Sequence, residues 1–337
     1  TMVPGGDFAP HLVACSDAAK NSAQGCIGLV GHHDTVFPPG SFEGFTLEGD
    51  IARGPGVLDM KGGLTVVLYA LRAVAERGLL SRLPLRLVIV SDEEIGSPDS
   101  TPLLQRSLRG ASAALVFEAG RAADAIITAR KGTGGIRTII AGKAAHAGNH
   151  HQQGANAIWA LARIVDRVQR LTDYGQGITV NAGTITGGEA RNTVPAHAEA
   201  SFDLRFVHLS DGEALVERFR AAAALAITDV AGTQVQFEGG VKRPPLERSD
   251  NNVALYREYA SHARAAGLGY GEAPLMGGGS DASTTAAMGV PSIDGLGPRG
   301  KGFHTHGEFI EVPTLLARAE ALTRMLVARA AAHHAAV

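Results

Sequence analysis

Short apolar runs and one helical stripe dominate the first part of the chain. The runs at residues 27–30, 85–90 and 113–117 are mostly apolar, which is typical of strands buried inside a sheet. A stripe of apolar residues at helical spacing lies between the first two runs: Leu64, Val67, Leu68, Leu71 and Val74. Strands that alternate with helices predict an α/β domain, which we place at residues 1–130.

The pattern changes near Gly132, where strand-like and helix-like segments follow another order. Strands are predicted at 136–141, 178–186, 198–206 and 234–237, and helices at 155–170 and 211–226. This order, β-α-β-β-α-β, is that of the split βαβ unit. The α/β pattern of the first part then resumes, with a helix at 252–266, a short strand at 291–294 and a helix at 313–332. We therefore expect an inserted domain at residues 131–241, and residues 242–337 as the second part of the first domain.

The composition fits a folded protein and narrows its partners. Of 337 residues, 45% are apolar and 19% are charged, and the formal net charge is -2, which argues against nucleic acid or an anionic membrane as partner. Two cysteines, Cys15 and Cys26, are too few for a disulfide scaffold or a four-cysteine zinc site. No apolar run reaches the length of a membrane span.

The first residues, 1–6, show neither the basic nor the apolar part of a signal peptide. We therefore expect a cytoplasmic protein, or a periplasmic one if a signal peptide precedes the given sequence. The first strand comes about thirty residues into the chain, which is early for an α/β domain. We expect that an N-terminal piece is lacking.

Candidate ligand residues follow each of the three apolar runs. His32 and Asp34 follow the first run, Asp92, Glu93 and Glu94 follow the second, and Glu118 follows the third. In open α/β sheets ligands bind at the carboxyl ends of the strands. Residues two apart in extended chain point to the same side, so a metal ligand at His32 and an orienting carboxylate at Asp34 can face one site. Adjacent acids at a strand end need water or a cation to stabilise them, and a solvated acidic turn is the alternative.

Three further segments carry residues of interest. Asp59 lies in a glycine-rich loop before the helical stripe, where an acid is otherwise a helix cap or turn residue. Gly278 and Gly279 precede a Ser-Asp helix start and allow close approach of a substrate carboxylate. His304 would supply the nitrogen donor for a second metal. Four other histidines are interpreted as surface residues: His150, His151, His333 and His334.

Seven motifs in this order resemble those of the M20 metallopeptidases, from about residue 25 to the end of the chain. They are His32-His33-Asp34-Thr35-Val36, Gly54-Pro55-Gly56 with Asp59 and Lys61-Gly62-Gly63, Asp92 to Ser97, Gly142 to Gly148, Asn192 to Ala196, Gly277 to Ala282, and His304. The chain looks most like the glutamate carboxypeptidase (carboxypeptidase G) branch, and more distantly like acetylornithine deacetylase and succinyl-diaminopimelate desuccinylase. The family normally has a longer N-terminal segment with a helix before the first strand.

The resemblance implies a zinc-peptidase-like catalytic domain with a mixed sheet, into which a ferredoxin-like α+β lid or dimerisation domain is inserted. It also implies two zinc ions per chain, with cobalt or manganese as alternatives. Asp59 would bridge the ions, His32 and Glu118 would complete one site, and Glu94 and His304 the other. The alignment favours His304 over His306 as the ligand.

Roles in catalysis and binding also follow from the resemblance. Asp34 would orient His32, and Glu93 would take a proton from the bridging water and pass it to the leaving nitrogen. His146 would reach the active site of a partner subunit in a homodimer and donate to the oxyanion. Asn192, Arg205 and Arg243 would hold the carboxylate of the substrate. A surface ion pair is the alternative for both arginines.

These observations give one leading hypothesis and several alternatives. The leading one is a dizinc carboxypeptidase that cleaves an amide bond of a small peptidyl or N-acyl substrate and releases a C-terminal amino acid of the glutamate type. A deacylase or desuccinylase of N-acyl amino acids would use the same metals. A non-catalytic metal-binding homologue is disfavoured because Glu93 and all five ligands are present. A dinucleotide-binding oxidoreductase is disfavoured because no G-x-G-x-x-G motif follows the first strand.

Overall fold

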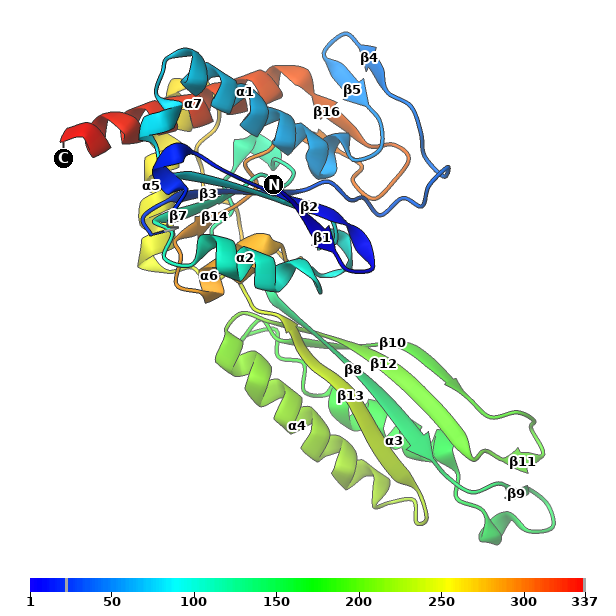
Figure 1. Ribbon diagram of the computed structural model, residues 1–337. Helices are drawn as coiled ribbons and strands as arrows, with labels where there is room; N and C mark the ends of the chain where they lie inside the picture. Colours follow the sequence, from blue (N-terminus) through cyan, green and yellow to red (C-terminus); the bar gives the residue numbers. More distant parts are fainter. Residues whose placement is uncertain (22–23, 336–337) are drawn as a thin grey trace. The chain divides into compact units, whose positions relative to one another are not determined.

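The computed structural model describes residues 1–21 and 24–335, with side chains in the last helix up to residue 332. The chain divides into two compact units (Figure 1). Unit 1 consists of Thr1–Arg130, Leu246–Met276 and the residues from Ser280 onward. Unit 2 consists of Lys131–Pro245 with Gly277–Gly279. No helix in the described ranges is both long and apolar enough to cross a membrane.

A six-stranded mixed sheet forms the middle of unit 1, in the order β1-β2-β6-β3-β7-β14. β3 pairs in parallel with β6 on one side and β7 on the other, so the three predicted strands are neighbours whose carboxyl ends share one edge. Antiparallel pairing of β1 with β2, and of β2 with β6, makes the sheet mixed. The strands are β1 (Met2–Gly5), β2 (Phe8–Cys15), β3 (Ile27–His32), β6 (Leu85–Val90), β7 (Ala113–Val116) and β14 (Ser292–Ile293).

Helices cover both faces of this sheet, which explains the continuous apolar runs of its strands. In β3, Leu29 packs into a core with α1, α5 and α7, while the next residue, Val30, packs into a core with α2 and α6 on the other face. A Cβ at Gly63 would clash with the carbonyl oxygen of Phe117, so the start of α1 approaches the end of β7 closely. The helices are α1 (Gly62–Glu76), α2 (Ser100–Leu108), α5 (Asp250–Ala265), α6 (Asp281–Ala287) and α7 (Val312–Ala335).

A second, smaller sheet of unit 1 has the order β15-β16-β5-β4 and was not predicted. Its strands are only two or three residues long: β4 (Thr46–Glu48), β5 (Ile51–Arg53), β15 (Gly300–Lys301) and β16 (Phe309–Glu311). Ala52, Val57, Leu58 and Ile310 form a small core beneath it. The loop between β15 and β16 carries His304, so this sheet places the last candidate ligand.

Unit 2 is an antiparallel sheet in the order β10-β12-β8-β13, with two helices packed on one face. The elements follow one another as β-α-β-β-α-β: β8 (Gly132–Ala141), α3 (Ala157–Gln169), β10 (Thr179–Gly187), β12 (His197–Phe206), α4 (Leu209–Ile227) and β13 (Gln234–Arg243). β13 continues past Phe237, where the predicted strand ends. The prediction stopped there because Gly239 and Gly240 interrupt the apolar pattern, but both glycines still pair with β8. The expected boundary at residue 241 therefore falls inside this strand.

Candidate metal centre

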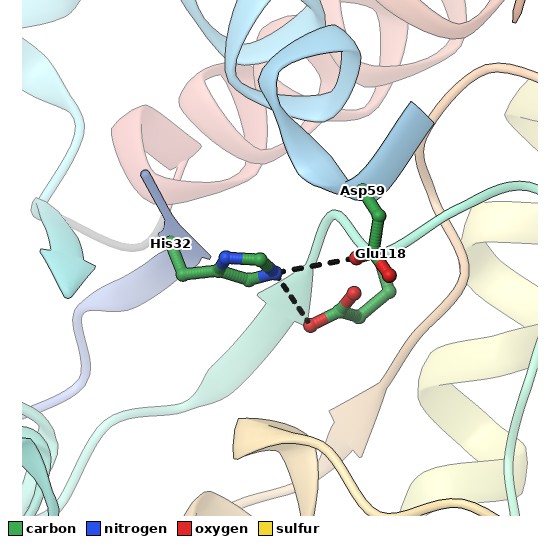
Figure 2. A group of neighbouring side chains, drawn as sticks. All are labelled: His32, Asp59 and Glu118. Atoms are coloured by element: carbon green, nitrogen blue, oxygen red, sulfur yellow. Dashed lines mark hydrogen bonds and ion pairs between the residues drawn. The ribbon is translucent and has the colours of Figure 1, made fainter. Parts of the chain in front are cut away.

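His32 stands at the end of β3 with each ring nitrogen facing different groups. Nδ1 lies 3.1 Å from the backbone oxygen of Asp34 and 3.3 Å from its Oδ1. Nε2 lies 3.3 Å from Oδ1 of Asp59 and 3.7 Å from Oε1 of Glu118 (Figure 2). Because a backbone oxygen only accepts hydrogen bonds, the Nδ1–H group donates to Asp34. Nε2 is then oriented toward the two carboxylates, as in a metal-binding histidine held by an outer partner.

Asp59 joins this group to a second one. Its Oδ2 lies 3.1 Å from Nε2 of His304, and the same nitrogen lies 3.3 Å from Oε2 of Glu94. Within each group, His32-Asp59-Glu118 and Asp59-Glu94-His304, the candidate ligand atoms lie within 4.8 Å of one another. His304 adopts a left-handed backbone with φ of 62°, a conformation that costs about 1–3 kcal/mol for a non-glycine residue and is often found at functional sites.

The electrostatics of the cluster favour cations. Burial raises the pKa of Glu94 to about 8, and the charge of Asp59 adds to this effect. Burial also raises the pKa of Glu118 well above its usual range, although His32 opposes the shift. Burial would raise the pKa of Asp59, but the contacts with His32, Glu118 and His304 together lower it to about 2. Two histidines and three crowded carboxylates are a donor set that suits zinc and related divalent ions, so the residues fit two metal sites that share Asp59.

Glu93 begins the short 3-10 helix η4 (Glu93–Ile95) directly after β6. Its negative charge contributes to the raised pKa of both Glu94 and Glu118. The carboxylate of Glu93 is therefore close enough to interact with both of these carboxyl groups. The backbone N–H of Glu94 donates to Oδ2 of Asp34 at 3.0 Å. Asp34 thus contacts both a candidate ligand of the first group, His32, and the backbone beside Glu93.

Glu308 is a residue near the site whose role the sequence did not reveal. Its side chain is 1% exposed. Oε1 accepts hydrogen bonds from the backbone N–H groups of Leu58 and Asp59 at 2.8 and 2.9 Å, and Oε2 accepts from Gly56 at 2.9 Å. Glu308 therefore fixes the backbone that presents Asp59. Its proximity to His304 in sequence was the only signal that could have indicated this role.

A second support, also not predicted, holds the acidic loop after β6. His11 is buried in β2, and its Nε2 lies 2.9 Å from Oδ2 of Asp99. Its Nδ1 accepts from the backbone N–H of Ser91 at 3.2 Å. Oδ2 of Asp92 accepts from the N–H groups of Asp99 and Ser100. Both ends of the segment that carries Glu93 are thus tied to buried polar groups.

Two other histidines next to candidate ligands in the chain, His33 and His306, point elsewhere. Nε2 of His33 lies 3.2 Å from the backbone oxygen of Pro10. The ring of His306 packs against Phe37 and Phe42, with ring centres 5.8 and 5.3 Å apart. The geometry therefore brings His304, and not His306, to the carboxylates. His333 and His334 lie beyond the described side chains.

In unit 2, His146 and Asn192 lie on neighbouring segments beyond one end of the main sheet. His146 in β9 (Ala145–His146) pairs with Thr193 in β11 (Thr193–Val194), and the N–H of Ala147 donates to the backbone oxygen of Asn192 at 2.9 Å. Nδ1 of His146 accepts from the N–H groups of Gly148 and Asn149, both at 3.1 Å. The neutral ring must therefore carry its proton on Nε2, so His146 is prepared to donate a hydrogen bond.

Arg205 and Arg243 lie at the other end of the same sheet, on either side of Thr133 in β8. Nε and Nη2 of Arg205 bind the two carboxylate oxygens of Asp203 at 2.7 and 2.9 Å, and Nη1 donates to the backbone oxygen of Gly277. Arg243 is buried, and a Cβ at Gly279 would lie 2.8 Å from its side chain. Arg205, Arg243 and the glycine segment with Gly278 thus form one group. His146 and Asn192 form another, separated from it by the length of β12, about 30 Å for an extended strand of this size.

The chain is similar in sequence and in fold to several known proteins. A profile of peptidase family M20/M25/M40 matches residues 28–328. Carboxypeptidase G2 of Pseudomonas sp. (strain RS-16) is 30% identical over 89% of this chain and 72% of its own length. Acetylornithine deacetylase of Myxococcus xanthus is 26% identical over 96% of this chain and 83% of its own length. The crystal structure of aminopeptidase PepT from Bacillus cereus has a TM-score of 0.79 at 24% identity, covering 95% of this chain and 85% of the other, and shows the same fold.

Proposed function

The chain belongs to peptidase family M20/M25/M40, and from this premise we propose that it is a carboxypeptidase-type amidohydrolase that releases an amino acid from the C-terminal side of an amide bond. The observation that carries the proposal is that Asp59 presents one oxygen to each of two His-carboxylate groups. Similarity to carboxypeptidase G2 supports a carboxypeptidase, and the resemblance of the sequence motifs implies a glutamate-type substrate. Similarity to acetylornithine deacetylase keeps an N-acyl-amino-acid deacylase as the second candidate.

Two divalent cations, zinc with cobalt or manganese as alternatives, would be held by His32, Asp59 and Glu118 on one side and by Asp59, Glu94 and His304 on the other. When bound, such ions acidify water and polarise the scissile carbonyl. Asp34 would keep His32 in the orientation that directs Nε2 to the site. Glu308 would keep Asp59 placed between the two groups.

Glu93 would act as the general base and then the general acid. As a water oxygen forms a bond to the carbonyl carbon, the Glu93 carboxylate takes the proton that the water loses. The same proton passes to the amide nitrogen as the C–N bond breaks, so the products are a carboxylic acid and an amine. The position of Glu93, in the field of Glu94 and Glu118 without belonging to either group, supports this role.

Unit 2 would be a ferredoxin-like lid and dimerisation domain. Its Nε2–H group on His146 would donate to the oxyanion, a stabilisation of about 3 kcal/mol for one donor. Because β12 separates His146 and Asn192 from Arg205 and Arg243, one chain cannot bring all four residues to one small substrate. A homodimer in which His146 acts on the partner subunit's site would resolve this separation. Arg243 is buried and adjoins Gly279, so we propose it as a carboxylate anchor, whereas the guanidinium of Arg205 binds Asp203.

The test combines metal content with turnover on the same protein. We expect about two zinc ions per chain and release of a single amino acid from a panel of N-acyl and peptidyl amino acids, lost on chelation and restored by zinc. Asp59→Asn should lower the content of both ions, while Asp166→Asn, at an exposed acid paired with Arg170 in unit 2, should lower neither. A wild-type protein that binds no metal and turns over none of the panel would overturn the proposal.

A further inference from the structure

Arg121 is a half-buried guanidinium beside the candidate metal centre that has no partner in the described chain. It follows Glu118 by three residues and immediately precedes the short helix η5 (Ala122–Asp124). Its Nε is buried and makes no hydrogen bond. No ion pair or hydrogen bond of its guanidinium is found among the residues that the structure describes. The guanidinium lies over the ring of Phe303, whose centre is 5.8 Å from Cζ.

The acids and cations around Arg121 are engaged with other groups. Nε of Arg130 binds Oδ2 of Asp294 at 2.6 Å, and the hydroxyl of Ser280 donates to the same oxygen. Arg299 binds Asp124 at 2.8 Å. Arg121 therefore differs from its basic neighbours, each of which has a carboxylate partner.

Electrostatics place Arg121 close to the candidate ligands. Burial lowers the pKa of its guanidinium, and the charge of Arg130 lowers it further, while Asp294, Glu118 and Asp59 raise it. Such an influence requires proximity, since charge interactions weaken with distance. Phe303, on which the guanidinium rests, directly precedes His304 in the chain. Arg121 thus lies within the range of charge interactions with Glu118 and Asp59, and it contacts the residue that precedes His304.

A partly buried guanidinium without a partner is unfavourable unless something else supplies the anion. Its forked geometry matches a carboxylate, which it binds through two parallel hydrogen bonds. An aromatic ring beneath it holds the plane in place and leaves its edge available. Arg205 offers no such edge, because its fork is already occupied by Asp203.

We propose that Arg121 binds a carboxylate of the substrate and so makes the enzyme selective for acidic substrates. That the bound carboxylate belongs to a substrate rests on the proposed function, whereas the anion site at Arg121 does not depend on it. The carboxylate is either the terminal carboxylate of the released amino acid or the acidic side chain of that amino acid. Both sources have the same chemistry, and the choice of substrates in the test separates them.

The test compares Arg121→Gln with Arg72→Gln, a matched control at an exposed arginine of unit 1 whose ion pair is with Glu76 on the same helix. Three substrates are used: an N-acyl glutamate, the corresponding N-acyl glutamine, and the N-acyl glutamate with its terminal carboxylate converted to an amide. For the first substrate, Arg121→Gln should raise KM about 10- to 100-fold, the expected effect of one charge-assisted pair. Turnover at saturation and metal content should stay near those of wild type and of Arg72→Gln.

The two modified substrates identify the carboxylate. The rise in KM caused by Arg121→Gln should disappear for the modified substrate that lacks the carboxylate bound by Arg121. It should persist for the other modified substrate. An equal effect on all three substrates, accompanied by altered metal content, would overturn the proposal and show that Arg121 balances the charge of the metal ligands. An unchanged KM for all three would overturn it as well.

A binding measurement separates this inference from the proposed function. Glutarate, a dicarboxylate that cannot be hydrolysed, is titrated calorimetrically into the zinc-loaded wild type and both variants. Weaker binding to Arg121→Gln alone supports the anion site even if the wild type turns over no substrate, in which case only the proposed function fails. Equal binding to all three proteins overturns the anion site even if the wild type is an active hydrolase.

Discussion

Unit 1 and unit 2 use acidic side chains in opposite ways. In unit 1, Asp59, Glu94 and Glu118 are gathered around two histidines at low exposure, and burial raises the pKa of Glu94 and Glu118. On the sheet of unit 2, Arg137 binds Glu199 at 2.5 Å and Glu238 at 3.1 Å across neighbouring strands, with side chains that remain partly in solvent. The first cluster gathers three carboxylates around two histidines, whereas both acids of the second cluster bind an arginine.

This difference between the two sets of acids indicates which of them has a function. Crowded, buried carboxylates raise the free energy of the fold unless a cation or proton compensates them, so their presence requires an explanation. Exposed cross-strand ion pairs contribute little and require none. Substitutions of acids and of their partners in each unit should therefore have very different consequences.

The largest effect is expected at Glu93. Glu93→Gln removes the proposed base without removing a candidate metal ligand, so turnover should fall by a factor of about 10²–10⁴ while metal content stays unchanged. Glu238→Gln, at an acid of unit 2 that binds Arg137, is the control and should leave both unchanged. Steady-state kinetics and metal analysis of the same preparations check the prediction. Near-normal turnover in Glu93→Gln would show that another group carries the proton.

The next largest effect is expected at Glu308, which binds the backbone of the loop that carries Asp59. In the wild type, backbone N–H groups donate to both carboxylate oxygens of Glu308. Glu308→Gln replaces one of these oxygens with an amide NH₂ group, which cannot accept, so we expect a loss of about 2–4 kcal/mol in the free energy of unfolding. Zinc affinity should fall with it, because Asp59 loses its fixed backbone. Denaturant titration measures the first effect and a competing chelator the second.

Glu320→Gln is the matched control for Glu308→Gln, since Glu320 makes an exposed pair with Arg324 one turn away on α7. It should change the free energy of unfolding by no more than about 0.5 kcal/mol. Equal effects of the two substitutions would mean that Glu308 does not organise the Asp59 loop.

These residues also show which parts of the site could be predicted. His32, Glu94 and Glu118 could be found because each follows an apolar run that forms a parallel strand. The local pattern of each run therefore predicts that all three residues lie at the same edge of the sheet. Glu308 could not, because its role depends on burial against the backbone of residues 56–59, far away in the sequence. Arg121 could not either, because a charged residue after a strand is normally solvated, and only the fold shows that its buried Nε has no hydrogen-bond partner among the described residues.

The fold shows the same division between local and distant determinants. The buried strands and long helices of unit 1 follow from their patterns, and the M20 family fold that the resemblance implies is confirmed. The hairpin of β1 and β2 was not predicted, because its residues are mostly exposed and include two prolines, so that no alternation marks them. The strands of the β4–β5 and β15–β16 pairs are too short for any pattern, and the two pairs join into one sheet only because β16 pairs with β5, far away in the sequence.

A smaller effect is expected from pH on the metal-free protein. A carboxyl group whose pKa is raised on folding, such as Glu94 with a pKa of about 8, stabilises the fold fully below its ordinary pKa and loses that contribution as pH rises through the raised value. His32 acts in the same direction, since Glu118, Asp34 and Asp59 raise its pKa against the effect of burial. The lowered pKa of Asp59 matters only at much lower pH.

We therefore expect the Tm of the chelated protein to fall between about pH 5 and about pH 8, and the gain in Tm on adding zinc to grow over the same range. Thermal unfolding with and without chelator at several pH values measures both. Glu94→Gln should reduce the slope of the chelated protein, because it removes one of the groups responsible. A chelated protein whose Tm rises over this range would contradict the assignment of uncompensated carboxylates.

The smallest effect is expected in unit 2, where the acids already have partners. Arg137→Gln removes the cation that lies between Glu199 and Glu238, but the three side chains are solvated, so water can replace the lost contacts. The change in Tm should be close to the limit of detection and should vanish at high salt, which screens exposed charges. Metal content and turnover should equal those of the wild type. A large, salt-resistant loss of stability would mean that the ion pairs of unit 2 are buried in the functional assembly, as they would be if this face of the sheet contacted a second subunit.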